Sequence, residues 1–291
     1  MSSVKNTEAR LRLSELRRSA AALAVTAFLG GTALIWGSGT VYSQVAVTPS
    51  PAEICLAANQ NLSLRASLPR TSARLRSGSA LKIVAIGSSS TVGLWVLSPE
   101  ASYPRVLQKE LERLRPNARI EVINSGRVGD TIPGSISRFD RDVLFYEPDL
   151  VIWQLGTNDV VWGGRTDGLW DLVVAGVRTL KSSGSDVILM DQQHASQVLA
   201  TSQHSRMQDI IADVARQEHV GLISRFELMR RSIEAGLSRT ALLSWDGLHH
   251  SADGYDCVGR SLARAISITA EASSAPVPSY PSARPSGRSG R

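Results

Sequence analysis

The sequence predicts an α/β fold in which one parallel sheet of five strands is covered by helices on both faces. Short apolar runs recur along residues 81–270, and segments with helical periodicity lie between them. Strands that alternate with helices form parallel sheets, because each helix carries the chain back to the start of the next strand. The runs also tend to end in small or polar residues, at the edge where sites form in such sheets.

The first half of the pattern gives three strands and a helix. The first strand is expected at Lys82–Ile86, where the apolar run stops at Gly87. Apolar residues at helical spacing predict a helix over 103–114. Arg119–Asn124 is the second expected strand, and the continuous apolar run Leu150–Leu155 is typical of a strand buried on both faces.

The second half continues the alternation. We expect a helix at Trp170–Leu180, a fourth strand at Asp186–Met190, a helix at Ser205–Gln217, a short fifth strand at Val220–Ser224 and a closing helix at Ser251–Ala270. One domain therefore occupies residues 81–271, and no internal repeats are apparent in it.

Charge is concentrated at the two ends of the 291 residues. The net charge is +6, but residues 1–45 carry five basic and two acidic side chains, and residues 272–291 carry three arginines and no acid. The remainder holds 24 basic and 24 acidic residues. A nucleic-acid partner is therefore not indicated for the folded part. Residues 272–291 are rich in Pro, Ser and Arg, and we expect them to be disordered.

The N-terminal segment, residues 1–43, has the pattern of an export signal. Basic residues precede an uncharged apolar run, Ser19–Trp36, and Val41-Tyr42-Ser43 offers a cleavage site. The run is near the minimum that spans a bilayer, so a cleaved signal peptide and a retained inner-membrane anchor both remain open. Either places the rest of the protein in the periplasm or outside the cell. We expect residues 44–80 to form a linker with at most one short helix.

Two cysteines, Cys55 and Cys257, leave two alternatives. In an oxidising compartment they could form a disulfide between the segment before the domain and its last helix. They could equally be two separate buried thiols. Neither belongs to a C-x-x-C motif, and the sequence predicts no metal site.

The stretch Lys82–Gly93 runs from the first strand into a turn with three serines. It lacks the lysine of a phosphate-binding P-loop and has no G-x-G-x-x-G motif. A flavin-phosphate loop, a turn that presents a nucleophilic serine, and a plain turn whose serines cap the next helix all remain compatible with it.

Residues elsewhere favour the nucleophile. Ester hydrolysis by serine needs a histidine base, a carboxylate that orients the histidine, and donors for the oxyanion. Ser89 supplies the hydroxyl, His249 the base, and Asp246, three residues earlier, the carboxylate. Gly129 offers a backbone N–H and Asn158 a side-chain amide, and a parallel sheet would bring all five residues to one edge.

These segments resemble the four blocks of the SGNH (GDSL-type) hydrolase superfamily, in the family's order. Gly87-Ser88-Ser89 matches G-D-S, Asn124 to Thr131 matches N-x-x-x-x-G-D-T, Gly156 to Asp159 matches G-x-N-D, and Asp246 and His249 match D-x-x-H. The resemblance covers about residues 80–270. It implies a flavodoxin-like three-layer α/β/α sandwich, a cofactor-free Ser89-His249-Asp246 triad, and an oxyanion hole at Gly129 and Asn158. Ser88 departs from it, because the family has aspartate there.

Other polar and aromatic residues are assigned less specific places. We expect His250 at the rim of the site and Asp159 in a structural role. His194 is expected on a surface loop, with the lining of the pocket as the alternative, and Asp191 as a helix cap, with a contact to the site as the alternative. Trp153 is expected in the core, and so are Trp162 and Trp170, for which the lining of an acyl or sugar groove is the alternative.

The sequence thus predicts an exported esterase acting on a small-molecule or polysaccharide ester. An O-acyltransferase would use the same residues, with a sugar hydroxyl in place of water. A flavodoxin-like module that binds FMN or carbohydrate without catalysis is the third alternative, although nothing in it would require Asp246 and His249.

Overall fold

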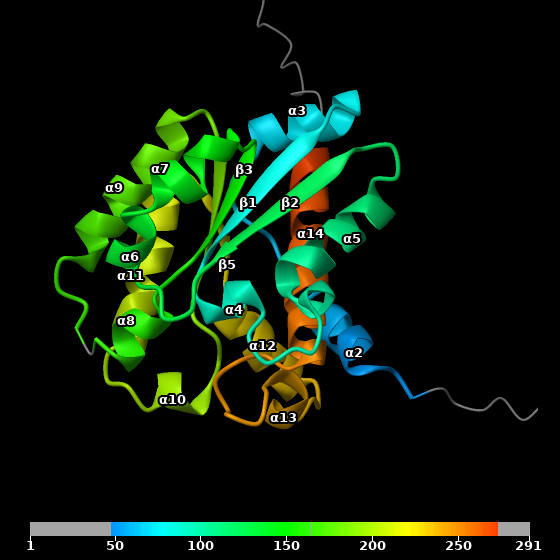
Figure 1. Cartoon of the computed structure of the whole chain (residues 1–291). Helices are drawn as coiled ribbons and strands as arrows, with labels where there is room; N and C mark the ends of the chain where they lie inside the picture. Colours follow the sequence, from blue (N-terminus) through cyan, green and yellow to red (C-terminus); the bar gives the residue numbers. More distant parts are fainter. Residues whose placement is uncertain (1–47, 164, 273–291) are drawn as a thin grey trace, which may run out of the picture. The chain divides into compact units, whose positions relative to one another are not determined.

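The computed structural model describes residues 48–163 and 165–272, and the structural statements that follow concern this part of the chain. Within it, five strands form one parallel sheet in the order β2-β1-β3-β4-β5 (Figure 1). The strands are β1 (Leu81–Gly87), β2 (Ile120–Gly126), β3 (Leu150–Gln154), β4 (Asp186–Met190) and β5 (Gly221–Ile223). The predicted α/β fold with a five-stranded parallel sheet is confirmed, and β4 has the predicted bounds.

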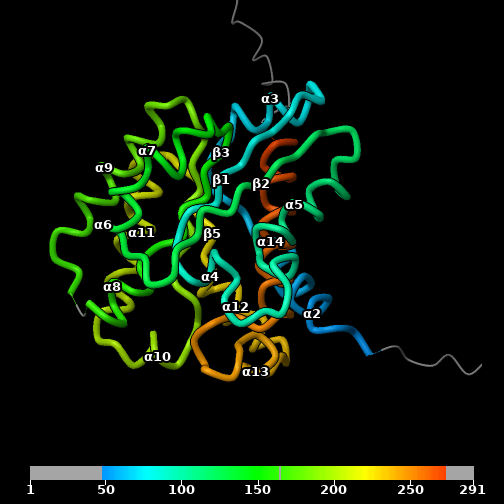
Figure 2. Tube along the Cα trace, in the orientation of Figure 1, coloured from blue at the N-terminus to red at the C-terminus, as the bar shows by residue number. Residues whose placement is uncertain are grey.

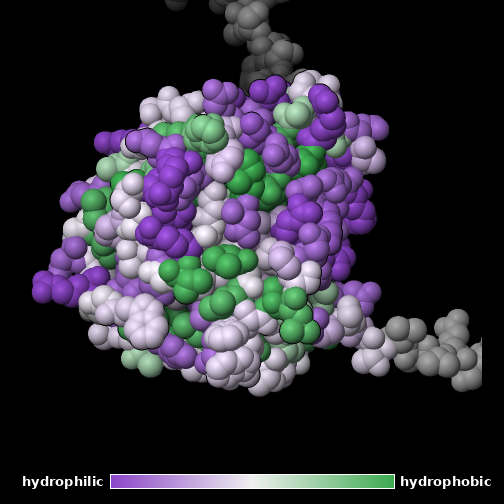
Figure 3. Space-filling view, in the orientation of Figure 1, coloured by the Kyte–Doolittle hydropathy of each residue, from purple (hydrophilic) through white to green (hydrophobic). Residues whose placement is uncertain are grey.

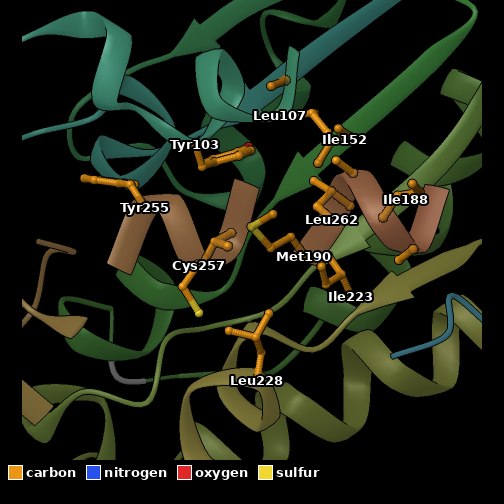
Figure 4. Close-up of a cluster of buried hydrophobic side chains, with 14 of the residues drawn as sticks. Tyr103, Leu107, Ile152, Ile188, Met190, Ile223, Leu228, Tyr255, Cys257 and Leu262 are labelled. Atoms are coloured by element: carbon orange, nitrogen blue, oxygen red, sulfur yellow. The ribbon is translucent and has the colours of Figure 1, made fainter. Parts of the chain in front are cut away.

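One face of the sheet is covered by α2 (Pro51–Ala58), α5 (Tyr103–Leu114), α12 (Arg225–Glu234) and α14 (Ala252–Ala272). Ile152 of β3 and Ile188 of β4 point into this layer, where they pack with Leu107 and Leu262 (Figure 4). The helix α5 begins and ends at the predicted residues. It is amphipathic, and its apolar stripe is buried against α14 and the sheet.

The opposite face is covered by α6 (Ile132–Ile136), α7 (Phe139–Asp142), α9 (Leu169–Ser182) and α11 (His204–Gln217). Val151 and Trp153 point to this side, whereas Ile152 between them points to the other. Alternate residues of one strand thus enter two separate cores, which explains why the run is apolar throughout. Trp153 is fully buried, as predicted.

Short helices gather where the strands end. Figure 2 shows α4 (Ser89–Val92), α8 (Thr157–Val161) and α10 (Ser196–Leu199), which follow β1, β3 and β4, together at the lower end of the sheet. The sequence pattern did not predict these three helices, nor α13 (Arg239–Leu242) and the ten-residue α12. Most of the five are too short to show a helical period.

The structure differs from the prediction for residues 44–80. Two helices form there, α2 and α3 (Pro69–Ser77), and they are part of the folded unit. A capping box between Ser50 and Glu53 starts α2, and Leu64 and Leu68 are buried in the core between the two helices. Tertiary packing makes this segment part of the domain, although its helices are too short to be recognised from their pattern.

Cys55 of α2 and Cys257 of α14 form a disulfide, with their Cα atoms 5.8 Å apart. The bond joins residues that are 202 positions apart and resolves the two alternatives that the sequence left open. It fastens α2 to the longest helix of the described chain.

Of the helices in the described ranges, none has both the length and the apolar character that a membrane crossing requires. The predicted apolar run Ser19–Trp36 and the predicted tail from residue 273 onward lie outside the described residues. Ala272, the first residue assigned to that tail, is the last residue of α14.

Candidate active site

The turn after β1 places Ser89 as the first residue of α4. The Ser89 side chain sits in a largely buried position, with 6% of the residue exposed. Gly87 precedes the turn, and a Cβ at this position would lie 2.5 Å from Oγ1 of Thr91 and 2.7 Å from Oε1 of Gln154. Only glycine therefore lets the end of β1 lie this close to the side chain of Gln154. The same side chain supports the serine turn.

Gln154 at the end of β3 holds the serine turn. Its side-chain oxygen Oε1 accepts hydrogen bonds from the backbone N–H of Ser88 at 2.8 Å, from Ser88 Oγ at 2.9 Å and from Thr91 Oγ1 at 3.2 Å. Gln154 is 2% exposed, so these bonds form in a site that water does not reach. One buried acceptor thus anchors the turn on both sides of Ser89, through Ser88 before it and Thr91 after it. Ser88 is the residue that stands where the family has aspartate.

The loop that carries Asp246 and His249 is closed by its own backbone. The N–H of Ser244 donates to the carbonyl of His249 at 2.7 Å, and Leu243 and His250 form an antiparallel bridge. Oδ1 of Asp246 accepts the N–H groups of Leu248 and His249, both at 3.0 Å. The spacing of three residues therefore lets the carboxylate order the loop with one oxygen and face the imidazole with the other.

Ser89, His249 and Asp246 form a continuous chain of hydrogen-bonded groups. His249 Nε2 lies 2.8 Å from Ser89 Oγ, and His249 Nδ1 lies 2.5 Å from Asp246 Oδ2. In the tautomer protonated at Nδ1, the serine hydroxyl donates to Nε2 and Nδ1–H donates to the carboxylate. This arrangement can remove the serine proton and stabilise the imidazolium that results.

The Asp246 carboxylate is held in its charged form. Burial alone would raise its pKa, but hydrogen bonds from the His249 ring and from the N–H groups of Leu248 and His249 lower the pKa below its ordinary value. The indole Nε1–H of Trp95 donates to Asp246 Oδ2 at 2.9 Å and adds a fourth donor. Two donors on each oxygen fix both the charge and the orientation of this carboxylate.

Gly129, in the turn after β2, and Asn158, in the helix after β3, lie at the same edge of the sheet. Asn158 belongs to α8, and its Nδ2 donates to the carbonyl of Asp130 at 2.7 Å, which ties α8 to the residue after Gly129. Gly129 has φ +76°, and a Cβ there would meet no atom within 4 Å. The structure thus joins the Gly129 loop to α8, whereas the hydroxyl of Ser89 bonds to His249.

The loop around Gly129 is supported by a buried ion pair. Asp130 Oδ2 accepts from Arg138 Nη2 at 2.6 Å, and both side chains are at most 4% exposed. Arg138 also donates to the carbonyl of Gly87, directly before the serine turn, at 3.1 Å. Asp159 contributes through Oδ1, which accepts the N–H of Ile132, in agreement with its expected structural role. Arg138 thus connects the Gly129 loop to the end of β1.

A second buried network supports the loop of His249. Arg225 donates to Oε1 of Gln193 at 2.7 Å, and Gln193 Nε2 donates to the carbonyl of Leu248 at 3.1 Å. Burial lowers the pKa of Arg225 to about 10 and raises that of Asp191 to about 6. Asp191 accepts the N–H of Phe226 and the hydroxyl of Ser224, so it caps α12 as predicted.

Two placements predicted from the sequence are wrong. His250 is only 1% exposed and lies inside the domain, with Nδ1 at 3.3 Å from the carbonyl of Leu242, not at the rim. Trp162 is 74% exposed and donates its Nε1–H to Asn158 Oδ1, so it is not part of the core. His194 lies in the loop after β4, as predicted, and is partly buried against the ring of Phe226.

Sequence reasoning missed Gln154, Arg138, Trp95 and Arg225. Gln154 interrupts an apolar strand at its last position, which is the signal that could have drawn attention to it. The other three carry no local signal.

Apolar surface also gathers near the site, as Figure 3 shows around the place that α4 has in Figure 1. Val92 and Leu97 are exposed in this part of the chain.

Comparisons with known proteins agree with the fold. An arylesterase from Vibrio mimicus is 24% identical over 185 residues, which are 64% of this chain and 88% of the arylesterase. A two-domain esterase active on acetylated mannans has a TM-score of 0.61 and is 24% identical. The match covers 71% of this chain but only 55% of the length of that esterase. A variant of an acetyl xylan esterase from Geobacillus stearothermophilus has a TM-score of 0.56 and 22% identity, covering 64% of this chain and 94% of the esterase.

The fold, the four sequence blocks and these relatives define a carboxylic ester hydrolase of the SGNH (GDSL-type) superfamily. More narrowly, residues 54–272 match the model of the non-GDSL lipase-like family, and the chain belongs to this family. The absence of the GDSL aspartate at Ser88 is consistent with that name.

Proposed function

We propose that the protein is an exported serine esterase that removes acyl groups, acetyl in particular, from polysaccharide. The observation that carries this proposal is the hydrogen-bonded chain from Ser89 Oγ through His249 to Asp246 Oδ2, with distances of 2.8 Å and 2.5 Å. The three residues come from two segments 157 positions or more apart, and the fold supports each segment with its own buried network.

In the first step, Ser89 Oγ attacks the carbonyl carbon of the ester while His249 Nε2 takes the hydroxyl proton. Asp246 stabilises the imidazolium, and the N–H groups of Gly129 and Ser89 with Nδ2 of Asn158 bind the oxyanion. Each such donor is worth about 3 kcal/mol in the transition state. His249 then returns the proton to the leaving alkoxide, and the sugar hydroxyl departs from an acyl-enzyme on Ser89.

In the second step, water replaces the sugar. His249 takes a proton from the water, the resulting hydroxide attacks the acyl carbonyl, and the bond to Ser89 Oγ breaks. The proton on His249 passes to Ser89 Oγ, and the carboxylic acid leaves. No cofactor is needed to balance either step.

The polysaccharide substrate is supported by two relatives, which act on acetylated mannans and on acetyl xylan. Solved variants of the second, at a serine, an aspartate and a histidine, are described as catalytic mutants of that esterase. Export is supported by the Cys55–Cys257 disulfide, because such bonds persist in oxidising compartments. The expected signal or anchor in residues 1–43 lies outside the described chain, so the disulfide is independent support.

The experiment labels the active serine directly. A fluorophosphonate probe should modify the purified protein at Ser89, and peptide mapping should identify this residue. Ser89→Ala should abolish labelling and lower the rate of p-nitrophenyl acetate hydrolysis by at least about a thousandfold. Ser90→Ala in the same turn is the matched control and should retain both. Hydrolysis that survives in Ser89→Ala contradicts the proposal, and acyl transfer to a saccharide instead of release of free acetate would identify an acyltransferase.

A further inference from the structure

Two tryptophans beside the triad expose their rings. Trp95 follows α4 and is 50% exposed, and Trp245 directly precedes Asp246 and is 81% exposed. Their ring centroids lie 5.2 Å apart in an edge-to-face arrangement, and the Trp95 ring lies 6.4 Å from that of His249. Because large aromatic rings are normally buried, a pair of them open to solvent next to a site indicates a binding surface.

The Trp95 ring is fixed in place. Its backbone has φ +72°, a conformation that is uncommon for any residue except glycine and persists where surrounding contacts enforce it. Its Nε1–H is held by Asp246 Oδ2 at 2.9 Å. The ring is therefore preorganised, and a ligand that packs against it does not have to order it first.

Trp245 also forms one wall of a cavity of about 340 Å³. The other lining residues are Ser196, Arg239, Thr240, Leu243, Ser244 and Gly247, so hydroxyl groups and a guanidinium share the lining with apolar surface. Arg239 Nη1 donates to Ser196 Oγ at 3.2 Å, which holds the guanidinium at this wall. A lining that combines an aromatic ring with several hydroxyl groups and a guanidinium matches a sugar ring, which has apolar C–H faces and hydroxyl groups at its edge.

A fatty acyl chain would fit this cavity poorly. It would remove water from the guanidinium of Arg239 and from the hydroxyl groups of Thr240 and the serines without offering them hydrogen bonds, and Leu243 is the single aliphatic side chain in the lining of this cavity. The hydroxyl and guanidinium groups beside the Trp245 ring therefore favour a saccharide.

We propose that this cavity is a sugar subsite, in which Trp245 stacks on a pyranose next to the one whose acyl group reaches Ser89. The position follows from the order of the rings, since only Trp95 lies between Trp245 and His249 in the chain of aromatic contacts. This inference rests on the proposed esterase function and assigns part of its substrate.

The test compares two substrates. Trp245→Ala should lower kcat/KM for acetylated mannan or xylan oligosaccharides about tenfold, mainly through KM, because it removes one aromatic contact. The same variant should hydrolyse p-nitrophenyl acetate within about twofold of the wild type, since that substrate has no sugar. Phe145→Ala is the control, because Phe145 is 77% exposed but precedes β3, at the far end of the sheet from Ser89.

Arg239→Ala keeps the test decisive if Trp245→Ala disturbs the neighbouring Asp246 and impairs both substrates. It removes a different side chain from the lining and should weaken saccharide hydrolysis several-fold while sparing p-nitrophenyl acetate. The subsite is refuted if neither variant shows this selective loss, or if the wild type hydrolyses p-nitrophenyl acetate but neither oligosaccharide. Failure of the esterase proposal would look different, because p-nitrophenyl acetate hydrolysis would then survive in Ser89→Ala.

Discussion

Trp95 donates its indole N–H to Oδ2 of Asp246, the same oxygen that lies 2.5 Å from His249 Nδ1. The loop after α4 thereby contacts the carboxylate that orients the proposed base. The side-chain hydrogen bond of Trp95 goes to Asp246 and not to Ser89, so we regard Trp95 as a positioning residue that acts through Asp246.

Trp95→Phe keeps an aromatic ring and removes only the donor. We expect kcat for p-nitrophenyl acetate to fall about fivefold with little change in KM, because the bond is half exposed and worth about 1 kcal/mol. Trp170→Phe on α9 is the matched control. Unchanged kcat, or a loss that appears in KM alone, would mean that the bond has no role in positioning.

Gln154→Leu should impair both stability and catalysis. The variant leaves the N–H and hydroxyl of Ser88 and the hydroxyl of Thr91 without their buried acceptor, at a cost of about 1–3 kcal/mol. Urea unfolding measures the first effect, and kcat the second. Gln154→Glu retains an acceptor oxygen and should recover more of kcat than Gln154→Leu does. Equal kcat in the two variants would show that the acceptor does not hold Ser89.

Removing the disulfide should affect stability and leave the chemistry intact. Replacing Cys55 and Cys257 by serine should lower the free energy of unfolding by about 2–5 kcal/mol, because the bond closes a very long loop. The wild type in reductant should behave like the variant in urea unfolding. Esterase kcat at 25 °C should stay within about twofold, since the bond joins α2 to α14 and not the loops of the triad. Equal stability with and without reductant would contradict this expectation.

His250 should make the protein sensitive to acid. Burial, with the charge of Arg225 nearby, lowers its pKa from 6.5 to about 3. Between these values the unfolded chain binds a proton that the folded chain does not, so stability falls as the pH drops from 6.5 towards 3.

His250→Asn removes the titrating group and keeps a side-chain donor for the carbonyl of Leu242. Between pH 8 and pH 4.5 the wild type should lose roughly 2–3 kcal/mol more of unfolding free energy than the variant. Asp191, with its pKa raised to about 6, has the opposite sign, because it adds stability as it becomes protonated in the folded state. Its effect is common to both proteins and cancels in the difference. Parallel pH dependences would show that His250 is protonated in the folded state.

Much of the fold could be predicted because its signals are local. The apolar run Leu150–Leu155 is buried on both faces, and Asp186–Met190 has the predicted bounds, since a central parallel strand needs such a run wherever it occurs. The segment with α2 and α3 could not be predicted in the same way. Its helices are short, and packing against the rest of the domain stabilises them.

The sequence by itself determined the order of the strands along the chain, the four family blocks and the residue types available for ester chemistry. Only the tertiary structure decided that Gln154 anchors Ser88, that Trp95 contacts Asp246, that Cys55 pairs with Cys257 and that His250 is buried. The physical reason is the range of the interactions. Periodicity and turns depend on neighbouring residues, whereas a hydrogen bond or a buried side chain depends on which remote segments the sheet brings together.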